Sequence, residues 1–391
     1  MSNQNLMERL LEGAAVEWSS LGNEDFIEIA NSGRRPVKAS SRTPGKIPYY
    51  GANNVQDYVD GHTHDGVFVL IAEDGSASLE NYSIQWATGK FWANNHVHVL
   101  RGTKALNNRF LFHYLRIVNF IPFLSGGGRA KLTKAKLVEI PIPIPPLEIQ
   151  SEIVRILDTF TKLTAELTAE LTARKKQYTY YRNQLLTFED GQVEWKALGK
   201  ITLSTSNIRW QNNEKTYRYI DLTSVSRDNN SVIETSEINA ENAPSRAQKI
   251  VLKGDVIFAT TRPTQQRLCL IDDEYSDEIA STGYCVLRAK PDEVLPKWIF
   301  FHLTSTDFKN YVEENQSGAA YPAISDAKVK DFKIPIPSLP EQARIVSILD
   351  KFDTLTSSLT EGLPREIELR QKQYEYYREM LLSFPKEEVK A

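Results

Sequence analysis

Apolar residues recur every three or four positions across a long segment of the chain, a spacing typical of an amphipathic helix. The stripe consists of Ile153, Ile156, Phe160, Leu163, Leu167, Leu171, Tyr178, Tyr181 and Leu185, with Arg174 as its polar member. A helix of about 40 residues extends over roughly 60 Å. One domain cannot bury so long a stripe, so we expect a second helix to pack on it.

The same pattern returns near the C-terminus, with a stripe that includes Ile345, Phe352, Tyr374, Tyr377 and Leu381. This copy has four more residues between its shared Phe and Gln, and they include Gly362 and Pro364. Both residue types interrupt helices, which predicts a kink or a break at this point. We expect the two helices to pack antiparallel, with a variable domain at each end of the pair.

The repeat extends beyond the helices. Gln150–Asp158 matches Gln342–Asp350, the Ile-Pro-Ile-Pro run at 142–145 returns at 334–337, and each helix ends on Lys-Gln-Tyr-x-Tyr-Tyr-Arg. Val16-Glu17-Trp18 also returns as Val193-Glu194-Trp195, whereas 23–99 and 200–286 show no convincing similarity. The order is therefore variable domain, helix, variable domain, helix. Such a frame offers a pseudo-two-fold surface to two copies of one partner, while its unlike domains would read an asymmetric site.

Each variable domain combines strands with helices. Val67–Ile71 and Asp255–Ala259 are short apolar runs typical of buried strands, and 107–118 and 296–312 carry apolar residues at helical spacing. Prolines at 141, 143, 145 and 146 predict a stiff extended connector ahead of the helix. We therefore predict an α+β chain: two mixed α/β recognition domains separated by two long antiparallel, coiled-coil-like helices, with a pseudo-two-fold internal repeat. The predicted divisions are 1–145, 146–190, 191–337 and 338–391.

Composition narrows the class of protein. The chain has 391 residues and a net charge of −3, which excludes a strongly basic nucleic-acid coat but allows a local basic face. The two cysteines, Cys269 and Cys285, have no metal-binding spacing and form no disulfide framework. A polar N-terminus and the lack of a long apolar run predict no signal peptide and no membrane span. We expect a cytoplasmic protein.

Three enzymatic readings lack their motifs. An amino-methyltransferase needs an Asn/Asp-Pro-Pro-aromatic motif, which the sequence lacks. A P-loop is also missing, because the Gly89-Lys90 pair is not preceded by the rest of that motif. Asp307-Phe308-Lys309 imitates a nuclease signature but falls in a segment predicted as helix, where positions two apart diverge. The spaced histidines His62, His64, His96 and His98 have no frame of carboxylates or cysteines, so structural or surface roles are favoured over metal binding. We predict no catalytic residue and no metal ligand.

The first variable domain has a basic stretch followed by paired tyrosines and asparagines. The candidate DNA-binding residues there are Arg34, Arg35, Lys38, Arg42, Tyr50, Asn53, Asn54, Arg129 and Lys131. Arg and Lys contact phosphates, and Arg and Asn can read base edges in the major groove. A solvated loop at 34–42 and a plain flexible turn at 126–129 are the alternatives.

In the second variable domain, one loop after a buried strand gathers two arginines and two glutamines. Its candidates are Thr261, Arg262, Gln265, Gln266 and Arg267, a composition suited to base-edge contacts. Tyr321 occupies the position that Arg129 holds in the first copy, and Arg227 is a weaker candidate. None of these residues can be assigned to a particular base.

A tetrapeptide repeat lies inside the first helix, at Thr164–Leu167 and Thr168–Leu171. One unit turns a helix by about 400° and lengthens it by ~6 Å, so units could be added while the apolar face is nearly preserved. Because DNA rises ~3.4 Å per base pair, one unit corresponds to one or two base pairs. The alternative is that this is simply good helix-forming sequence.

Together these motifs resemble the specificity subunit of Type I restriction–modification systems over essentially the whole chain, most closely the IC subfamily. The resemblance implies a non-catalytic subunit that directs adenine methylation and restriction to a bipartite, asymmetric DNA site. It implies that each domain reads one half-site and that the helices set the spacer, through residues such as Ile153, Phe160, Leu167, Tyr178, Tyr181, Ile345, Phe352, Tyr374 and Tyr377. The implied partners are double-stranded DNA, two methyltransferase subunits, and restriction/translocase subunits. S-adenosylmethionine, ATP and Mg would be bound by those partner subunits and no cofactor by this chain. The alternative is a helical scaffold with little DNA specificity.

Overall fold

The computed structural model describes residues 4–11, 13–126, 130–189, 191–358 and 361–385. The chain folds as two compact units, each built around one variable domain. The first unit comprises 1–165 and 369–391, and the second comprises 166–368. Each unit therefore contains parts of both copies of the repeated helix, because the chain passes from the first unit to the second and back.

The first unit is built on a six-stranded sheet with the strand order β2-β7-β5-β6-β3-β4. The strands are β2 (Ile27–Ile29), β3 (Pro44–Gly51), β4 (Asn54–Val59), β5 (His64–Ala72), β6 (Ile84–Ala93) and β7 (Val97–Gly102). Its short helices are α1 (Gln4–Leu11), α2 (Asn108–Leu115) and α3 (Lys134–Leu137). The apolar run at 67–71 lies within the central strand β5, as the sequence predicts, and α2 covers one sheet face through Phe110 and Leu111.

The second unit contains two four-stranded sheets, ordered β10-β17-β14-β15 and β12-β11-β16-β13. The strands are β10 (Thr202–Leu203), β11 (Tyr217–Ile220), β12 (Ser236–Ile238), β13 (Ala247–Val251), β14 (Val256–Ala259), β15 (Leu268–Leu270), β16 (Glu278–Ser281) and β17 (Tyr284–Ala289). The helices are α5 (Leu198–Ile201), α6 (Pro296–Leu303), α7 (Thr306–Asn315) and α8 (Asp326–Asp331). The predicted helix at 296–312 is thus two helices, divided where the Ser305 hydroxyl caps α7. Asp307 and Lys309 lie in α7, which confirms the helix that argues against a nuclease motif.

The frames of the two units match although their sheets differ. Strands β5, β6 and β7 of the first unit correspond to β14, β15 and β17 of the second, because β5 pairs with β6 and β7 just as β14 pairs with β15 and β17. The variable domains therefore share a central three-stranded arrangement. The strands around it are different, in agreement with the lack of sequence similarity there.

The proline-rich connectors are extended, as predicted, and each also forms half of a two-stranded sheet. Strand β8 (Pro141–Ile144) pairs with β1 (Glu17–Ser20), so that Trp18 lies opposite Pro143. Strand β18 (Lys333–Ile336) pairs with β9 (Glu194–Ala197), so that Trp195 lies opposite Pro335. These pairings explain why the Val-Glu-Trp motif is repeated together with the Ile-Pro-Ile-Pro run. Proline has no backbone N–H to donate to a neighbouring strand, and an edge strand tolerates this because one of its sides has no neighbour.

The long helices are α4 (Leu147–Leu186), α9 (Leu339–Ser357) and α10 (Gly362–Leu382). The second copy is interrupted between α9 and α10, which confirms the break predicted near Gly362. Gly362 itself has φ of +74°, a conformation that favours glycine. An added Cβ there would lie 2.5 Å from the Thr354 carbonyl oxygen, so the break also excludes a side chain at this position.

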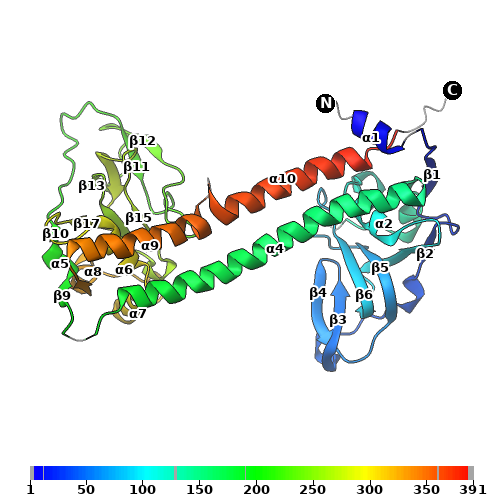
Figure 1. Cartoon of the computed structure of the whole chain (residues 1–391), viewed down its shortest axis with the longest axis horizontal. Coiled ribbons are helices and arrows are strands. Elements are labelled where there is room, and N and C mark those ends of the chain that lie inside the picture. Colours follow the sequence, from blue (N-terminus) through cyan, green and yellow to red (C-terminus); the bar gives the residue numbers. More distant parts are fainter. Residues whose placement is uncertain (1–3, 12, 127–129, 190, 359–360, 386–391) are drawn as a thin grey trace. The chain divides into compact units, whose positions relative to one another are not determined.

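Aromatic pairs join the helices within each unit. In the first unit, Phe160 stacks on Tyr377 with ring centroids 5.2 Å apart, and the end of α10 runs beside the start of α4 (Figure 1). In the second unit, Tyr181 stacks on Phe352 at 5.9 Å, and Tyr178 lies 6.1 Å from the same ring. Phe160 and Phe352 are equivalent in the repeat, as are Tyr377 and Tyr181. In each unit, the first part of one helix copy contacts the last part of the other copy, so the two copies pack antiparallel.

The start of each long helix is fixed in its unit's core. Ile153 and Leu157 are buried with Leu381 and Leu382 in the first unit, and Ile345 and Leu349 are buried with Leu186 in the second. Farther along α4, Leu163, Leu167 and Leu171 are half-buried. In the part of the chain that the structure describes, no helix is both long and apolar enough to cross a membrane.

Candidate nucleic-acid interface

In both units, the end of the central strand meets a second segment that precedes a short helix. In the first unit, the Leu132 amide donates to the Glu73 carbonyl at 2.7 Å. In the second, the Ile324 amide donates to the Thr260 carbonyl at 2.9 Å. Each unit also has an isolated β-bridge at the next position, between Asp74 and Lys131 in the first unit and between Thr261 and Ala323 in the second. Some of the sequence candidates lie at this shared junction, and the side chains there differ between the two units: Arg34 and Lys131 in the first, Thr261, Arg262 and Tyr321 in the second.

In the second unit, the junction brings together two candidates that lie far apart in sequence. The guanidinium carbon of Arg262 lies 5.3 Å from the centre of the Tyr321 ring, and the Arg262 amide donates to the Pro322 carbonyl at 2.7 Å. Tyr321 is 71% exposed, although a large aromatic side chain would gain from burial. An exposed cation–π pair at a loop tip is suited to contacting a planar, polar or anionic ligand.

The backbone of the same loop adopts an unusual conformation. Arg262 and Gln266 have φ of +49° and +53°, so both are left-handed, and they flank the 3-10 turn Pro263–Gln265. Such a conformation costs a residue other than glycine about 1 kcal/mol, and it is concentrated at functional sites. The loop therefore holds the Arg262 side chain outward at some cost in backbone strain.

Of the other candidates in the second unit, some hold the loop in shape through contacts within the protein, and Arg227 is exposed. Arg267 donates from Nη1 to the Val225 carbonyl and from Nε to Oε1 of Gln265 at 3.4 Å, so it ties the loop to the neighbouring turn. Gln266 donates to the Pro263 carbonyl at 3.4 Å, a weak contact within the loop. Thr261 is fixed by its bridge to Ala323. Arg227 is exposed in the turn that Arg267 contacts.

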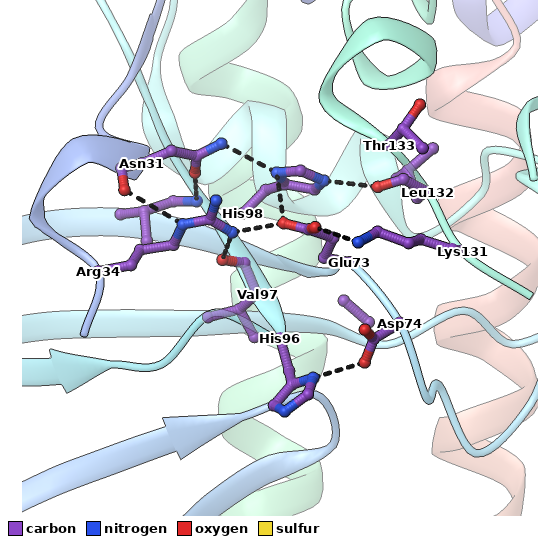
Figure 2. A network of polar contacts seen from close by, with 12 residues as sticks. Asn31, Arg34, Glu73, Asp74, His96, Val97, His98, Lys131, Leu132 and Thr133 are labelled. Atoms are coloured by element: carbon purple, nitrogen blue, oxygen red, sulfur yellow. Dashed lines mark hydrogen bonds and ion pairs between the residues drawn. The ribbon is translucent and has the colours of Figure 1, made fainter. Parts of the chain in front are cut away.

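In the first unit, the junction is held by one carboxylate (Figure 2). Glu73 forms ion pairs with Arg34 at 2.6 Å and with Lys131 at 2.9 Å. Burial acts to raise the pKa of Glu73, but the hydrogen bonds from Arg34 and Lys131 outweigh it and hold that pKa below its ordinary value. Glu73 is therefore ionised at neutral pH and neutralises much of the positive charge that the sequence places here.

Arg34 is consequently engaged within the protein. Its Nη1 also donates to the Val97 carbonyl at 2.8 Å, and its Nε donates to the Asn31 carbonyl at 3.2 Å. This arrangement fixes the loop rather than presenting a guanidinium to DNA. Lys131 also pairs with Glu73, but its side chain remains 46% exposed and can still reach a ligand.

The histidines near this junction have structural or surface positions, as expected. His98 is fully buried, contacts the Leu132 carbonyl through Nε2 at 2.7 Å, and has a lowered pKa because burial disfavours its charged form. His96 is partly exposed and contacts Asp74 at 2.6 Å (Figure 2). His64 stacks on Phe91 at 5.1 Å.

The remaining first-domain candidates are dispersed. Arg35 and Lys38 are exposed, whereas Arg42 lies 4.1 Å over the Tyr49 ring and pairs with Asp57 at 3.2 Å. Tyr50, Asn53 and Asn54 line one hollow together. Arg129 lies outside the described residues. The structure therefore does not place the basic stretch 34–42 on one uniform face.

Several side chains that organise this interface belong to no motif that marks them as interface residues in the sequence. Glu73 and Asp74 follow the predicted strand directly, and this position could have drawn attention to them. The buried glutamines Gln150 and Gln342 occupy equivalent positions, and in the sequence they stand out only as part of a repeated motif.

Comparisons with known proteins agree with this architecture. The family model for the Type I restriction modification DNA specificity domain matches residues 15–174 and 194–369. A putative type I restriction enzyme specificity subunit from Haemophilus influenzae is 47% identical over 396 residues, covering 98% of this chain and 99% of the relative. The EcoR124I/EcoR124II specificity subunit of Escherichia coli is 36% identical over 422 residues, covering 100% and 99%.

A solved structure is similar in fold over nearly the full length. The Type I restriction–modification S subunit from M. genitalium superposes with a TM-score of 0.60, covering 96% of this chain and 98% of that one. The sequences are 15% identical, so this likeness concerns the fold alone.

Proposed function

Because the chain belongs to the family of Type I restriction–modification DNA specificity subunits, we propose that each of its two units reads one half of a split DNA site. The chain is the DNA-sequence-recognition subunit of such a system, and catalysis belongs to partner subunits. The observation that carries the proposal is that one junction, repeated on a matching frame, presents different side chains in the two units. A repeated frame with unlike reading surfaces suits an asymmetric, bipartite target.

The second unit's contribution to reading centres on Arg262 and Tyr321. An arginine can donate two hydrogen bonds to a guanine edge, and an exposed aromatic ring can stack on a base or pack on a sugar. Gln265 and Gln266 are the neighbouring amide groups that can pair with adenine. In the first unit, Lys131 at the junction and the exposed Arg35 and Lys38 are suited to phosphate contacts.

The helices support the partner and spacer parts of the proposal. Tyr180 and Tyr376 are equivalent in the repeat, and both are exposed, at 59% and 50%. Two equivalent exposed tyrosines would allow two methyltransferase subunits to dock in the same way. The helices would set the length of the unread spacer, and restriction/translocase subunits would join this assembly. S-adenosylmethionine, ATP and Mg would be held by those partners, and the complex would act on DNA in the cytoplasm.

Sequencing of modified adenines tests this proposal. The chain would be expressed with a family methyltransferase subunit in a host without other modification systems. The expected result is a split motif, methylated on both strands, that disappears when the chain is omitted. A stable complex that creates no new motif would contradict the proposal and favour a protein scaffold.

A further inference from the structure

A polar hollow of about 420 Å³ lies in the first unit, where strands β3, β4 and β6 approach α2 and the end of α10. Asparagine, serine, glutamine and tyrosine side chains form much of its lining. The charged groups of its described lining are Arg116, which follows α2 directly, and Arg378 from α10, and no carboxylate accompanies them there. The hollow therefore combines neutral hydrogen-bonding groups with two positive charges.

Both arginines lie against one aromatic ring. The guanidinium carbons of Arg116 and Arg378 are 5.9 Å and 5.5 Å from the centre of the Tyr374 ring, and Arg116 donates to the Tyr374 hydroxyl at 3.3 Å. Two like charges near one ring repel each other unless an anion lies between or beside them. The ring orients both guanidiniums but does not neutralise them.

Neither arginine forms an ion pair with any residue that the structure describes, and Nε of Arg378 is buried without a hydrogen-bond partner there. Arg109, two turns earlier on α2, shows the contrast, because its Nε pairs with Asp158 at 2.8 Å. Buried donors normally have partners. Nε of Arg182, the equivalent of Arg378 in the repeat, is buried in the same way, so what marks the first unit is that Arg378 lies beside Arg116 in a hollow whose described lining has no carboxylate. Two arginines in such a hollow favour an external acceptor that carries negative charge.

The hollow also adjoins the reading junction. Asn53 lines it and at the same time receives a hydrogen bond from the Ala77 amide at 2.8 Å and donates to the Gly75 carbonyl at 2.7 Å. Residues 75–77 follow directly on Asp74, which pairs with Lys131. A duplex that contacts the junction would thus bring its backbone close to the hollow. Arg, Asn, Ser, Gln and Tyr side chains are the groups that commonly hold DNA phosphates.

We propose that this hollow binds a phosphate of the DNA backbone and that Arg116 and Arg378 hold it. The inference rests on the proposed function, since it assumes that the first unit contacts DNA. It adds an anchoring site that carries no sequence information, separate from the residues that read bases. Among the described parts of the chain, we expect this anchor in the first unit only.

The second unit has a smaller hollow beside the matching strand β15 and the matching helix α6, with a volume of about 270 Å³. Its lining includes Asp272, Glu274, Asp350 and Asp353 against one lysine, Lys297. Burial raises the pKa of Asp353, and the neighbouring Asp350 acts in the same direction, while Lys297 and Arg182 oppose the rise. Such a hollow repels phosphate. The two units therefore share a frame, but we expect only the first to carry this backbone contact.

The test measures DNA affinity against salt concentration, using the complex of this chain with its methyltransferase subunits and the DNA site found by adenine sequencing. Because log K falls with log[salt] by about 0.9 per neutralised phosphate, and the hollow is proposed to hold one phosphate, the double variant Arg116→Gln, Arg378→Gln should have a slope shallower by about 0.9. Its affinity should fall by a similar factor for cognate and unrelated DNA. Arg116→Lys with Arg378→Lys should keep most of the slope. Arg101→Gln, which removes one charge from an exposed ion pair with Glu28, should leave the slope unchanged.

Ethylation of individual phosphates locates the contact. Modification of a phosphate beside one half-site should weaken the wild-type complex and have no further effect on the double variant. An unchanged salt slope in a folded double variant would overturn the inference, while the proposed function would stand if the cognate site were still methylated. Loss of methyltransferase binding with an unchanged slope would also overturn it, because the occupant would then be an acidic protein surface. A wild-type complex without any preferred DNA site would instead contradict the proposed function itself.

Discussion

Gln150 and Gln342 make the same three hydrogen bonds in their respective units. Gln150 accepts from the Asn107 amide at 2.7 Å and donates to the Ala105 and Pro145 carbonyls at 3.0 and 2.8 Å. Gln342 accepts from the Leu295 amide at 2.9 Å and donates to the Glu293 and Pro337 carbonyls at 3.0 and 2.9 Å. Both side chains are fully buried. Each one fastens the start of a long helix to the proline connector and to the loop before α2 or α6.

Replacing either glutamine by leucine should destabilise its unit strongly. The change would leave one buried N–H and two carbonyls unsatisfied, and each such group costs about 1 to 3 kcal/mol. We expect Gln150→Leu and Gln342→Leu to lower the unfolding free energy by at least about 2 kcal/mol, measured by urea denaturation of the full chain. Gln371→Leu, at an exposed position of α10, is the matched control. Equal unfolding free energies of all three variants would show that the buried glutamines do not hold the helix starts in place.

The Arg262–Tyr321 pair should matter for recognition and little for folding. Arg262→Gln should weaken binding of the cognate site by about 1 to 3 kcal/mol and relax the preference within one half-site only. Tyr321→Ala should act in the same direction, since the ring supports the guanidinium. Competition binding with half-site variants measures both effects. Arg218→Gln, which removes an exposed ion pair with Glu274, is the control. A loss that is uniform over all sequences would assign the pair to phosphate contact instead.

Glu73 should make the first unit sensitive to acid. Its folded pKa is lowered, so its stabilising contribution is fully present above its ordinary value of 4.5 and is lost as pH falls through the folded pKa. Glu73→Gln should therefore be less stable than the wild type at neutral pH, with a gap that narrows below about pH 4.5. Thermal unfolding of both proteins across that range measures it. A gap that stays constant with pH would show that charge pairing with Arg34 and Lys131 contributes nothing.

The tetrapeptide repeat lies where the chain passes from the first unit to the second, at Ala165 and Glu166. Inserting one further Thr-Ala-Glu-Leu unit after Leu171 should lengthen α4 by ~6 Å and keep its apolar face. We expect the methylated motif to retain both half-sites with a spacer one or two base pairs longer. Inserting three residues instead would rotate the face and should reduce assembly. An unchanged spacer in the four-residue variant would contradict the ruler role of the helices.

The sequence predicted the frame well because the frame is repeated. Two independent copies of the same apolar stripe, proline run and helix exit make each assignment more secure, and the break near Gly362 followed from known helix chemistry. The pairing of Val-Glu-Trp with the proline run was not predicted, since pairing of β1 with β8 joins segments more than a hundred positions apart.

The interface was harder to predict because it depends on tertiary contacts. Composition and repeat position point to the loop at 261–267 and to Tyr321, but only the fold shows that Arg262 lies over Tyr321. Arg34 has the residue type of a DNA contact, yet the half-buried carboxylate of Glu73 forms an ion pair with it. Whether a charged side chain faces solvent or an internal partner is decided by residues far away in sequence.

Replacing the first recognition domain by a second copy of the other tests the central claim, that one repeated frame carries two unlike recognition domains. In this variant, residues 17–146 are replaced by residues 194–338, so that both positions carry the second recognition domain. The junctions fall at equivalent strands, and Gln150 can make the bonds that Gln342 makes. Sequencing of modified adenines should then show a palindromic site made of two inverted copies of one original half-site. A stable, active complex that still methylates the original asymmetric site would contradict the account.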